Sequence, residues 1–154
     1  MSDPVPAPLR RVPAIDGWFT IDAEPTLLGN RCTSCGTVFF PKASFFCRNP
    51  DCAGDEFTDA PLSRRGRIWS FTDAQYQPPP PYLPRAEPFR PFALAAVELD
   101  DEQMVVLGQV ADGYTVADLE VGQPVELVVE ELYSDDEHDY LVYKWKPVDE
   151  RVDA

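Results

Sequence analysis

Four cysteines are the residues in this chain whose type and spacing could do chemistry. Cys32 and Cys35 have two residues between them, and Cys47 and Cys52 follow after a gap of eleven with four residues between them. Zn²⁺ binds four tetrahedral ligands, and two close pairs of thiolates at this separation are typical of zinc-ribbon or rubredoxin-like sites. We therefore predict a structural Zn²⁺ site whose ligands are Cys32, Cys35, Cys47 and Cys52.

The residues around the first pair support a ribbon. Gly36 follows Cys35, where a tight turn needs a residue that tolerates positive φ. Residues 27–32 and 37–42 can then pair as two strands with the first cysteine pair at their tip. Iron could occupy the same four-thiolate site, whereas a redox Cys-x-x-Cys needs a βαβ context that this segment lacks. A closed four-thiolate shell leaves no open position, so we expect no catalysis at the metal.

Other catalytic groups do not form a pattern. The single histidine, His138, lies in the acidic turn SDDEHDY, where we expect it to be solvated. No Ser-His-Asp or Cys-His arrangement and no Gly-rich phosphate loop can be assembled from the sequence. The sequence thus offers no self-contained active site.

The charge balance limits the class of ligand. With 27 acidic and 13 basic residues, the formal net charge is −14. This charge disfavours nucleic-acid binding, the alternative function for a zinc-ribbon protein, because phosphate neutralisation supplies most of such affinity. Basic residues gather at Arg64, Arg65 and Arg67. These arginines either pair with nearby acids or bind a phosphorylated ligand or an acidic partner surface.

Membrane and export signals are not predicted. No stretch approaches the roughly 20 apolar residues of a membrane span. The first residues, MSDPVPAPLRRVPAIDG, carry prolines and charges where a signal peptide has an apolar core. We therefore expect a cytoplasmic protein without a membrane partner, and cytoplasmic cysteine clusters more often bind metal than form disulfides.

Short alternating segments predict the elements that position these residues. β-branched and aromatic residues with period-two patterning predict five strands, at residues 66–76, 92–99, 104–110, 124–133 and 140–146. Strands two and three, and strands four and five, should form hairpins, and residues 116–122 could form a short helical turn. This order fits a five-stranded OB-type barrel, although a small open sheet or an SH3-like barrel would give a similar pattern.

The chain divides into four predicted parts. Residues 1–16 form a mobile Pro-rich arm, residues 17–60 the zinc-ribbon module, residues 64–147 the barrel and residues 148–154 an acidic tail.

The loop between the first two barrel strands is unusual. Seven of the fifteen residues 77–91 are proline, so this loop should be extended and stiff. It also carries Tyr82, Phe89 and Arg90. Either its apolar side chains fold back on the barrel, or the loop is a preformed arm that binds a partner protein.

The combined motifs resemble a known family. The order of the motifs resembles that of the zinc-ribbon OB-fold family first described as a domain of unknown function. The motifs are, in order, a Cys-x-x-Cys-Gly knuckle, residues 38–41 (VFFP), a second cysteine pair, residues 66–72 (GRIWSFT) and residues 121–127 (VGQPVEL). The resemblance covers residues 17–147 and implies a mainly β chain, with an N-terminal rubredoxin-like zinc ribbon followed by a five-stranded OB-type barrel. The four cysteines match the family's zinc ligands.

This resemblance also implies a function. Family members accompany thiolase-superfamily enzymes that act on coenzyme A thioesters, including thiolases of aromatic degradation, steroid side-chain aldolases, the archaeal thiolase and hydroxymethylglutaryl-CoA synthase assembly and an acyltransferase complex. They are usually non-catalytic subunits, and the partner carries the reactive groups. We therefore expect a hetero-oligomeric accessory subunit that stabilises a thiolase-like or aldolase partner and helps to bind or channel the thioester. A stand-alone acyl-CoA enzyme is the remaining option.

Two features depart from the family pattern. Many relatives begin with an amphipathic helix, whereas residues 17–29 contain Pro25 and leave room for a short helix only. The second cysteine pair is also wider than the family's common Cys-x-x-Cys. The first departure bears on partner contacts at the N-terminus, and neither departure removes a metal ligand.

Overall fold

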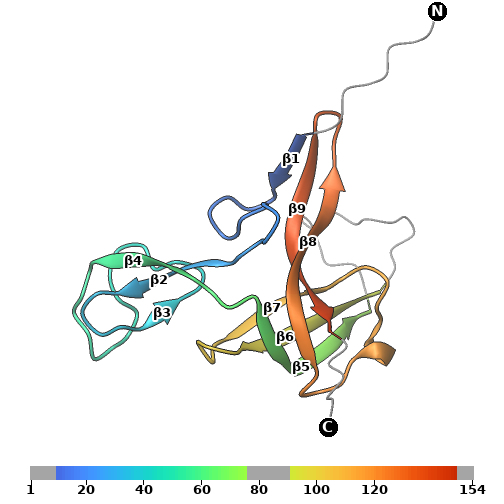
Figure 1. Ribbon diagram of the computed structural model, residues 1–154. Helices are drawn as coiled ribbons and strands as arrows, with labels where there is room; N and C mark the ends of the chain where they lie inside the picture. The colour runs from blue at the N-terminus through green and yellow to red at the C-terminus, as the bar shows by residue number, and fades with distance from the viewer. Residues whose placement is uncertain (1–9, 76–90, 149–154) are drawn as a thin grey trace, which may run out of the picture.

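The computed structural model describes residues 10–75 and 91–148 and is mainly β. A small three-stranded sheet lies beside a larger sheet that closes into a barrel (Figure 1). The small sheet contains β2 (Leu28–Cys32), β3 (Val38–Phe39) and β4 (Phe57–Pro61). The larger sheet contains β1 (Arg10–Pro13), β5 (Arg65–Ala74), β6 (Phe92–Leu99), β7 (Val105–Val110), β8 (Pro124–Ser134) and β9 (His138–Pro147).

Five strands form the closed barrel. Their order is β8-β5-β6-β7-β9, and the pairing of β8 with β9 closes the circle. Strand β7 runs parallel to β9, whereas the other barrel pairs are antiparallel. This order is that of an OB-type barrel, so the predicted fold class is confirmed and the open-sheet and SH3-like alternatives are not.

The barrel core follows from alternation along the strands. In β6, Ala93, Ala95, Val97 and Leu99 are buried and alternate with more exposed residues. They pack with inward side chains of the other strands, among them Ile68, Val106, Val125, Leu127 and Trp145. Close approach of β5 and β6 requires glycine at position 66, because a Cβ there would collide with the carbonyl oxygen of Glu98.

The zinc-ribbon module shares this core. Phe19 and Leu27 of the module, and Leu62 just after it, belong to the same buried cluster as the barrel residues. The ring of Phe40 also lies edge-on to Tyr143 of β9, with 6.1 Å between the ring centroids. The small sheet is therefore attached to the barrel through apolar contacts.

The N-terminal segment differs from its prediction. Residues 10–13, which we assigned to a mobile arm, form β1 and pair in parallel with residues 138–141 of β9. The β8–β9 hairpin extends beyond the barrel (Figure 1), and its outer edge offers unpaired backbone groups that an additional strand can satisfy. Residues 17–29 contain no helix, because the chain instead turns back on itself with a bridge between Phe19 and Leu27.

Helical structure is minimal. A 3₁₀ turn at Val116–Asp118 begins with a capping box. The Thr115 side chain accepts from the N–H of Ala117, and the Asp118 side chain accepts from the N–H of Thr115. This turn confirms the predicted short helical element. Within residues 10–75 and 91–148, no helix has the length and apolar composition needed to cross a membrane. Tyr82, Phe89 and Arg90, predicted to contact a partner, lie outside the described residues.

Candidate metal centre

The first cysteine pair lies at the tip of the β2–β3 hairpin. Asn30 pairs with Phe39 and Arg31 pairs with Val38 in this hairpin, so the predicted two-stranded ribbon is confirmed. Cys32 is the last residue of β2, and Gly36 adopts a φ of 77° just after Cys35. The backbone N–H of Gly36 donates to the carbonyl oxygen of Cys32 at 2.9 Å, which closes the turn.

The second cysteine pair lies in a loop shaped by an asparagine. The N–H of Asp51 donates to the Asn49 side chain at 3.0 Å, and the N–H of Cys52 donates to the Asn49 carbonyl at 3.0 Å. Such side-chain bonds to the following backbone are typical of Asx turns. They explain how a pair with four intervening residues still brings Cys47 and Cys52 to one point.

The four sulfur atoms converge. The Sγ atoms of Cys32 and Cys52 are 3.8 Å apart, those of Cys35 and Cys47 are 3.6 Å apart, and all four lie within 4.8 Å of one another. Disulfide sulfurs would be about 2 Å apart. A tetrahedral Zn²⁺ with bonds of about 2.3 Å places its sulfurs about 3.8 Å apart. The donor set and its spacing therefore fit a tetrahedral thiolate-bound metal ion.

Hydrogen bonds from neighbouring groups point at these sulfurs. The N–H of Asn49 lies 3.5 Å from the Cys47 Sγ, and the N–H of Gly54 lies 3.3 Å from the Cys52 Sγ. The Thr37 hydroxyl lies 3.1 Å from the Cys35 Sγ. Donors in these positions would stabilise thiolates and orient them around a cation.

The ionisation of the cluster is uneven. Hydrogen bonds from the Thr37 side chain and backbone lower the pKa of Cys35 to about 6. Burial, by contrast, raises the pKa of Cys47 to about 12. The four thiols would therefore not all ionise at neutral pH by themselves. A bound dication would favour all four thiolates together, because its charge is the largest local electrostatic influence.

The three arginines predicted as a cluster contact different acceptors. The Arg64 Nε donates to the carbonyl of Pro25 at 2.9 Å, and Arg65 lies 3.9 Å from the Glu126 carboxylate. The Arg67 guanidinium donates to the carbonyl of Gly122 at 3.0 Å. They therefore tie the start of β5 to neighbouring segments.

A buried lysine was missed by sequence reasoning. Lys144 lies in β9 with a side chain only 1% exposed, and its Nζ lies 3.1 Å from Asp112 and 3.3 Å from Glu130. The N–H of Asp112 also donates to Glu130 at 2.9 Å. Because Lys144 lies between the buried Tyr143 and Trp145, strand alternation predicts that its side chain points outward. The sequence carries no signal for the two distant carboxylates that surround its ammonium group.

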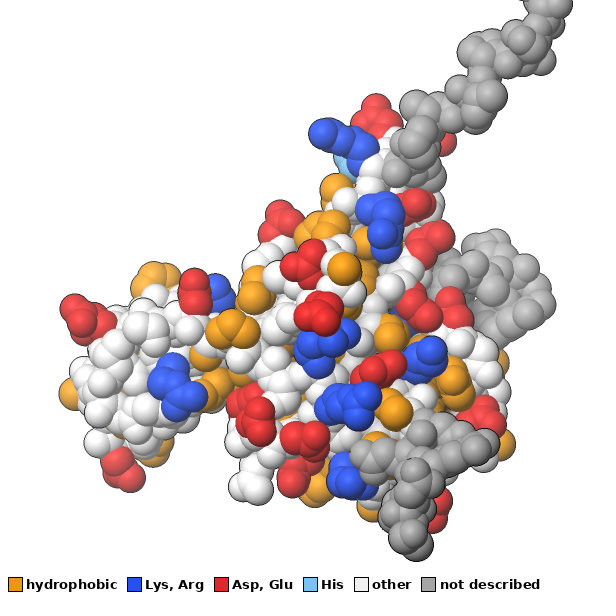
Figure 2. All heavy atoms as spheres, viewed as in Figure 1, with side chains coloured by type: hydrophobic (Ala, Val, Ile, Leu, Met, Phe, Trp, Pro, Cys, Tyr) orange, Lys and Arg blue, Asp and Glu red, His pale blue; other side chains and the backbone are white. Residues whose placement is uncertain are grey.

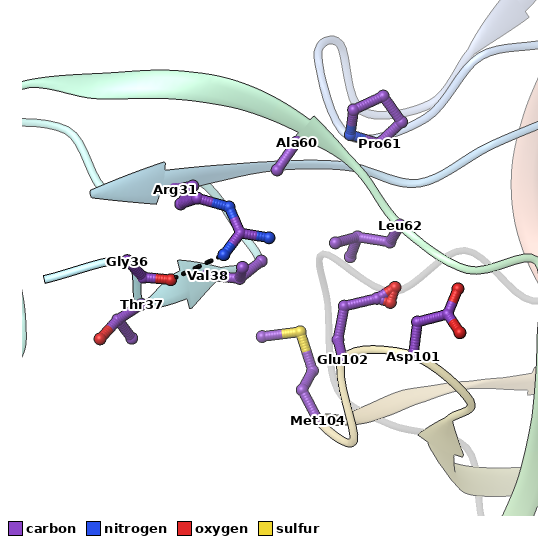
Figure 3. A pocket seen from close by; sticks show the side chains of 10 residues that line it. All are labelled: Arg31, Gly36, Thr37, Val38, Ala60, Pro61, Leu62, Asp101, Glu102 and Met104. Carbon is purple, nitrogen blue, oxygen red and sulfur yellow. Dashed lines mark hydrogen bonds between the residues drawn. The ribbon is translucent and has the colours of Figure 1, made fainter. Parts of the chain in front are cut away.

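A cavity between ribbon and barrel was also not predicted. Its volume is about 560 Å³, and Figure 3 shows Arg31 facing it from the ribbon and Glu102 facing it from the β6–β7 turn. The Glu102 carboxylate is already engaged, since it accepts hydrogen bonds from the Ser63 N–H and hydroxyl at 2.7 Å each. Arg31 donates to the carbonyl of Gly36 at 3.0 Å. Glu102 thus joins the β6–β7 turn to the segment between β4 and β5, whereas Arg31 bonds within the ribbon.

Comparison with known families matches both structural parts. Residues 19–58 match the family model for the rubredoxin-like zinc ribbon domain of ChsH2, and residues 59–130 match that for the C-terminal OB-fold domain of ChsH2. The two matches are contiguous and follow the observed order of ribbon and barrel. The first contains all four clustered cysteines.

Individual relatives resemble the chain to different extents. A DUF35 domain-containing scaffold protein from Methanocaldococcus jannaschii is 28% identical over 145 residues, which cover 92% of this chain and 95% of that protein. The benzoylsuccinyl-CoA thiolase subunit BbsA from Thauera aromatica is 51% identical over 49 residues, 32% of each chain. Among solved structures, an Ltp2-ChsH2(DUF35) aldolase matches with a TM-score of 0.57 and 25% identity, covering 79% of this chain and 84% of that one.

Proposed function

Because this chain belongs to the ChsH2-type family, whose members join a rubredoxin-like zinc ribbon to an OB-fold domain, we propose that it is a non-catalytic accessory subunit of a thiolase-like or aldolase enzyme. The observation that carries the proposal is the likeness of both parts to subunits of such enzymes. Relatives include a thiolase subunit and an Ltp2-ChsH2 aldolase, and the M. jannaschii relative that spans almost the whole chain is a scaffold protein.

The distribution of reactive groups supports an accessory role. The single histidine, His138, lies at the tip of the β8–β9 hairpin, with its Nδ1 3.8 Å from the Asp135 carboxylate. All four cysteines of the sequence lie in the metal cluster. The partner would then supply the nucleophile and the base for the reaction.

The metal in this proposal is Zn²⁺ with a structural role. Four thiolates fill its tetrahedral shell and leave no position for a substrate. The ribbon's own sheet is short, with two residues in β3 and five each in β2 and β4. A bound ion would therefore supply much of the free energy that folds this module.

The finer proposal is that the chain helps to bind or channel the coenzyme A thioester. The candidate contacts are Arg64, Arg65 and Arg67 for phosphate groups or an acidic surface, and Tyr82, Phe89 and Arg90 for the partner. In the described residues, Arg64 also lines a cavity of about 290 Å³ together with Arg11, and this cavity contains Asp22 and Glu126 as well. The acidic groups would weaken anion binding by the free subunit, so thioester binding would need the partner.

Nucleic-acid binding remains the disfavoured alternative. The net charge is −14, and Figure 2 shows acidic and basic side chains interspersed over the barrel face in view rather than a continuous basic surface. Steeply salt-dependent binding of an oligonucleotide would reverse this ranking.

Co-purification tests the proposed function. The chain would be co-expressed with thiolase-superfamily proteins from the same organism, and the mass of each product would be measured by light scattering after size exclusion. We expect one species containing both chains that persists at about 0.5 M salt, where weak pairing of exposed charges is screened. Separate elution of the two chains would refute the accessory role.

A further inference from the structure

Two adjacent aromatic side chains of the ribbon face solvent. Phe45 is 84% exposed and Phe46 is 69% exposed. Other ribbon phenylalanines pack against aromatic neighbours: Phe39 lies edge-on to Phe57 with centroids 6.3 Å apart, and Phe40 contacts Tyr143. Exposed aromatic pairs are costly in water and mark interaction sites more often than isolated apolar residues do.

Both ends of the segment that carries these rings are fixed. The Asn30 side chain donates to the carbonyl of Ala43 at 2.9 Å and accepts from its N–H at 3.1 Å, and both residues are buried. At the other end, Cys47 is buried in the metal cluster, and its N–H donates to Gly54 at 2.8 Å. Only three residues separate Ala43 from Cys47, so the rings of Phe45 and Phe46 are held outward.

The flanking residues add stiffness and positive charge. The Arg48 guanidinium lies 5.6 Å from the centroid of Phe39 and donates to the carbonyl of Lys42 at 3.2 Å. Residues 42–48 (KASFFCR) contain two basic and no acidic residues in a chain of net charge −14. Lys42 pairs with Asp59 at 3.0 Å, whereas Arg48, two residues after Phe46 in sequence, contacts the Phe39 ring and the Lys42 carbonyl. Arg48 is therefore the cation of this segment for a carboxylate of the partner.

We propose that Phe45 and Phe46 are the anchor by which this chain binds its catalytic subunit, inserting into an apolar pocket of that subunit with a carboxylate on the rim near Arg48. This inference rests on the proposed function and specifies the binding surface. Rigid aromatic side chains bind with little loss of conformational entropy. Such buried anchors carry most of the binding free energy in protein interfaces.

A second copy of this chain is a poorer occupant. Two cavities among the described residues are lined in part by charged side chains, including Arg31, Asp101 and Glu102 in one and Arg11, Asp22 and Arg64 in the other. Neither offers an apolar pocket for two phenyl rings. Self-association would also bring together two chains of net charge −14, which repel each other.

A double substitution tests the anchor. The binding partner would be a thiolase-superfamily protein from the same organism. Its dissociation constant would be measured with the wild type, F45S/F46S, F45L/F46L and V121S. Val121 is a matched control because it is 64% exposed and lies in the barrel part of the chain. We expect F45S/F46S to weaken binding about 100-fold or more, mainly through faster dissociation. V121S should bind within about twofold of wild type, and F45L/F46L, which keeps apolar side chains, should bind between these values.

The outcomes separate the anchor from the accessory role. Unchanged binding by F45S/F46S, with wild type forming the complex, would overturn the anchor and leave the proposed function intact. If wild type itself does not bind, both proposals fail. A wild-type dimer that F45S/F46S converts to monomer, with unchanged binding to the catalytic subunit, would overturn the anchor in favour of self-association. Metal content and thermal unfolding are measured for each variant to check that it is folded. If F45S/F46S loses metal, the single variant F46S is used in its place.

Discussion

The ring of Phe40, which directly follows β3 of the ribbon, lies edge-on to the ring of Tyr143 in β9 of the barrel, with 6.1 Å between centroids. Trp18 lies edge-on to Phe40 at 5.3 Å, and Phe19 lies edge-on to Tyr143 at 5.9 Å. The Tyr143 hydroxyl also donates to the carbonyl of Leu107 at 2.8 Å. These aromatic contacts fix the zinc ribbon against the barrel, so a partner that binds one part meets a defined arrangement of both.

Replacing Phe40 with alanine should loosen this junction. Phe40 is half-buried and packs on the barrel core, so F40A should lower the free energy of unfolding by about 2 kcal/mol. F45A is the matched control in the same module, and its exposed ring should cost less than about 0.5 kcal/mol. Denaturant titration measures both, and equal effects of the two variants would contradict the assigned junction.

Removing a metal ligand should unfold the ribbon. C32S takes away one of four converging sulfurs, so bound Zn²⁺ should fall from about one per chain to near zero and β2–β4 should lose amide protection. Elemental analysis and hydrogen exchange measure the two effects, with S34A as a control at an exposed position beside Cys32. Full metal stoichiometry in C32S would show that Cys32 is not a required ligand.

Removing the buried ammonium group should destabilise the barrel. K144M leaves the carboxylates of Asp112 and Glu130 close together without their cation. We expect a loss of about 3 kcal/mol in the free energy of unfolding. K146M, two residues along β9 and exposed, should change stability by less than about 0.5 kcal/mol. Similar unfolding curves for the two variants would mean that the Lys144 ion pairs contribute nothing.

Stability should decline at alkaline pH through Tyr143. Burial raises the pKa of the Tyr143 phenol above its ordinary value of 10.0, so the folded chain keeps a proton that the unfolded chain releases. The corresponding stabilisation is fully present below about pH 10 and is lost as the pH rises through the folded-state pKa. Y143F should therefore unfold with a shallower pH dependence above pH 10 than wild type. Identical slopes would exclude Tyr143 as the source.

Local patterns predicted what depends on neighbouring residues in the chain. The two-residue spacing of Cys32 and Cys35 and the alternation of buried residues in β6 are both visible within a few residues of sequence. The ribbon, the barrel strands and the cysteine cluster could therefore be predicted. Pairing of β1 with β9 and the ion pairs of Lys144 join residues far apart in sequence, and no local pattern encodes them. The exposure of Phe45 and Phe46 is likewise set by the distant Asn30, which pins Ala43.

Adjacent arginines show a related limit. Arg64, Arg65 and Arg67 are close in sequence, but residues 65 and 67 lie on the exposed side of β5, whereas Arg64 precedes the strand and donates to Pro25. These three arginines are therefore neighbours in sequence, but the geometry of β5 directs their side chains to different acceptors.

The most direct test of an accessory role is thioester turnover by three preparations at matched concentrations. These are the isolated chain, an isolated thiolase-superfamily protein from the same organism, and the two together. We expect no turnover by this chain alone and the highest rate for the pair. Turnover by the isolated chain, or a partner whose rate and stability do not change when the chain is added, would contradict the accessory role.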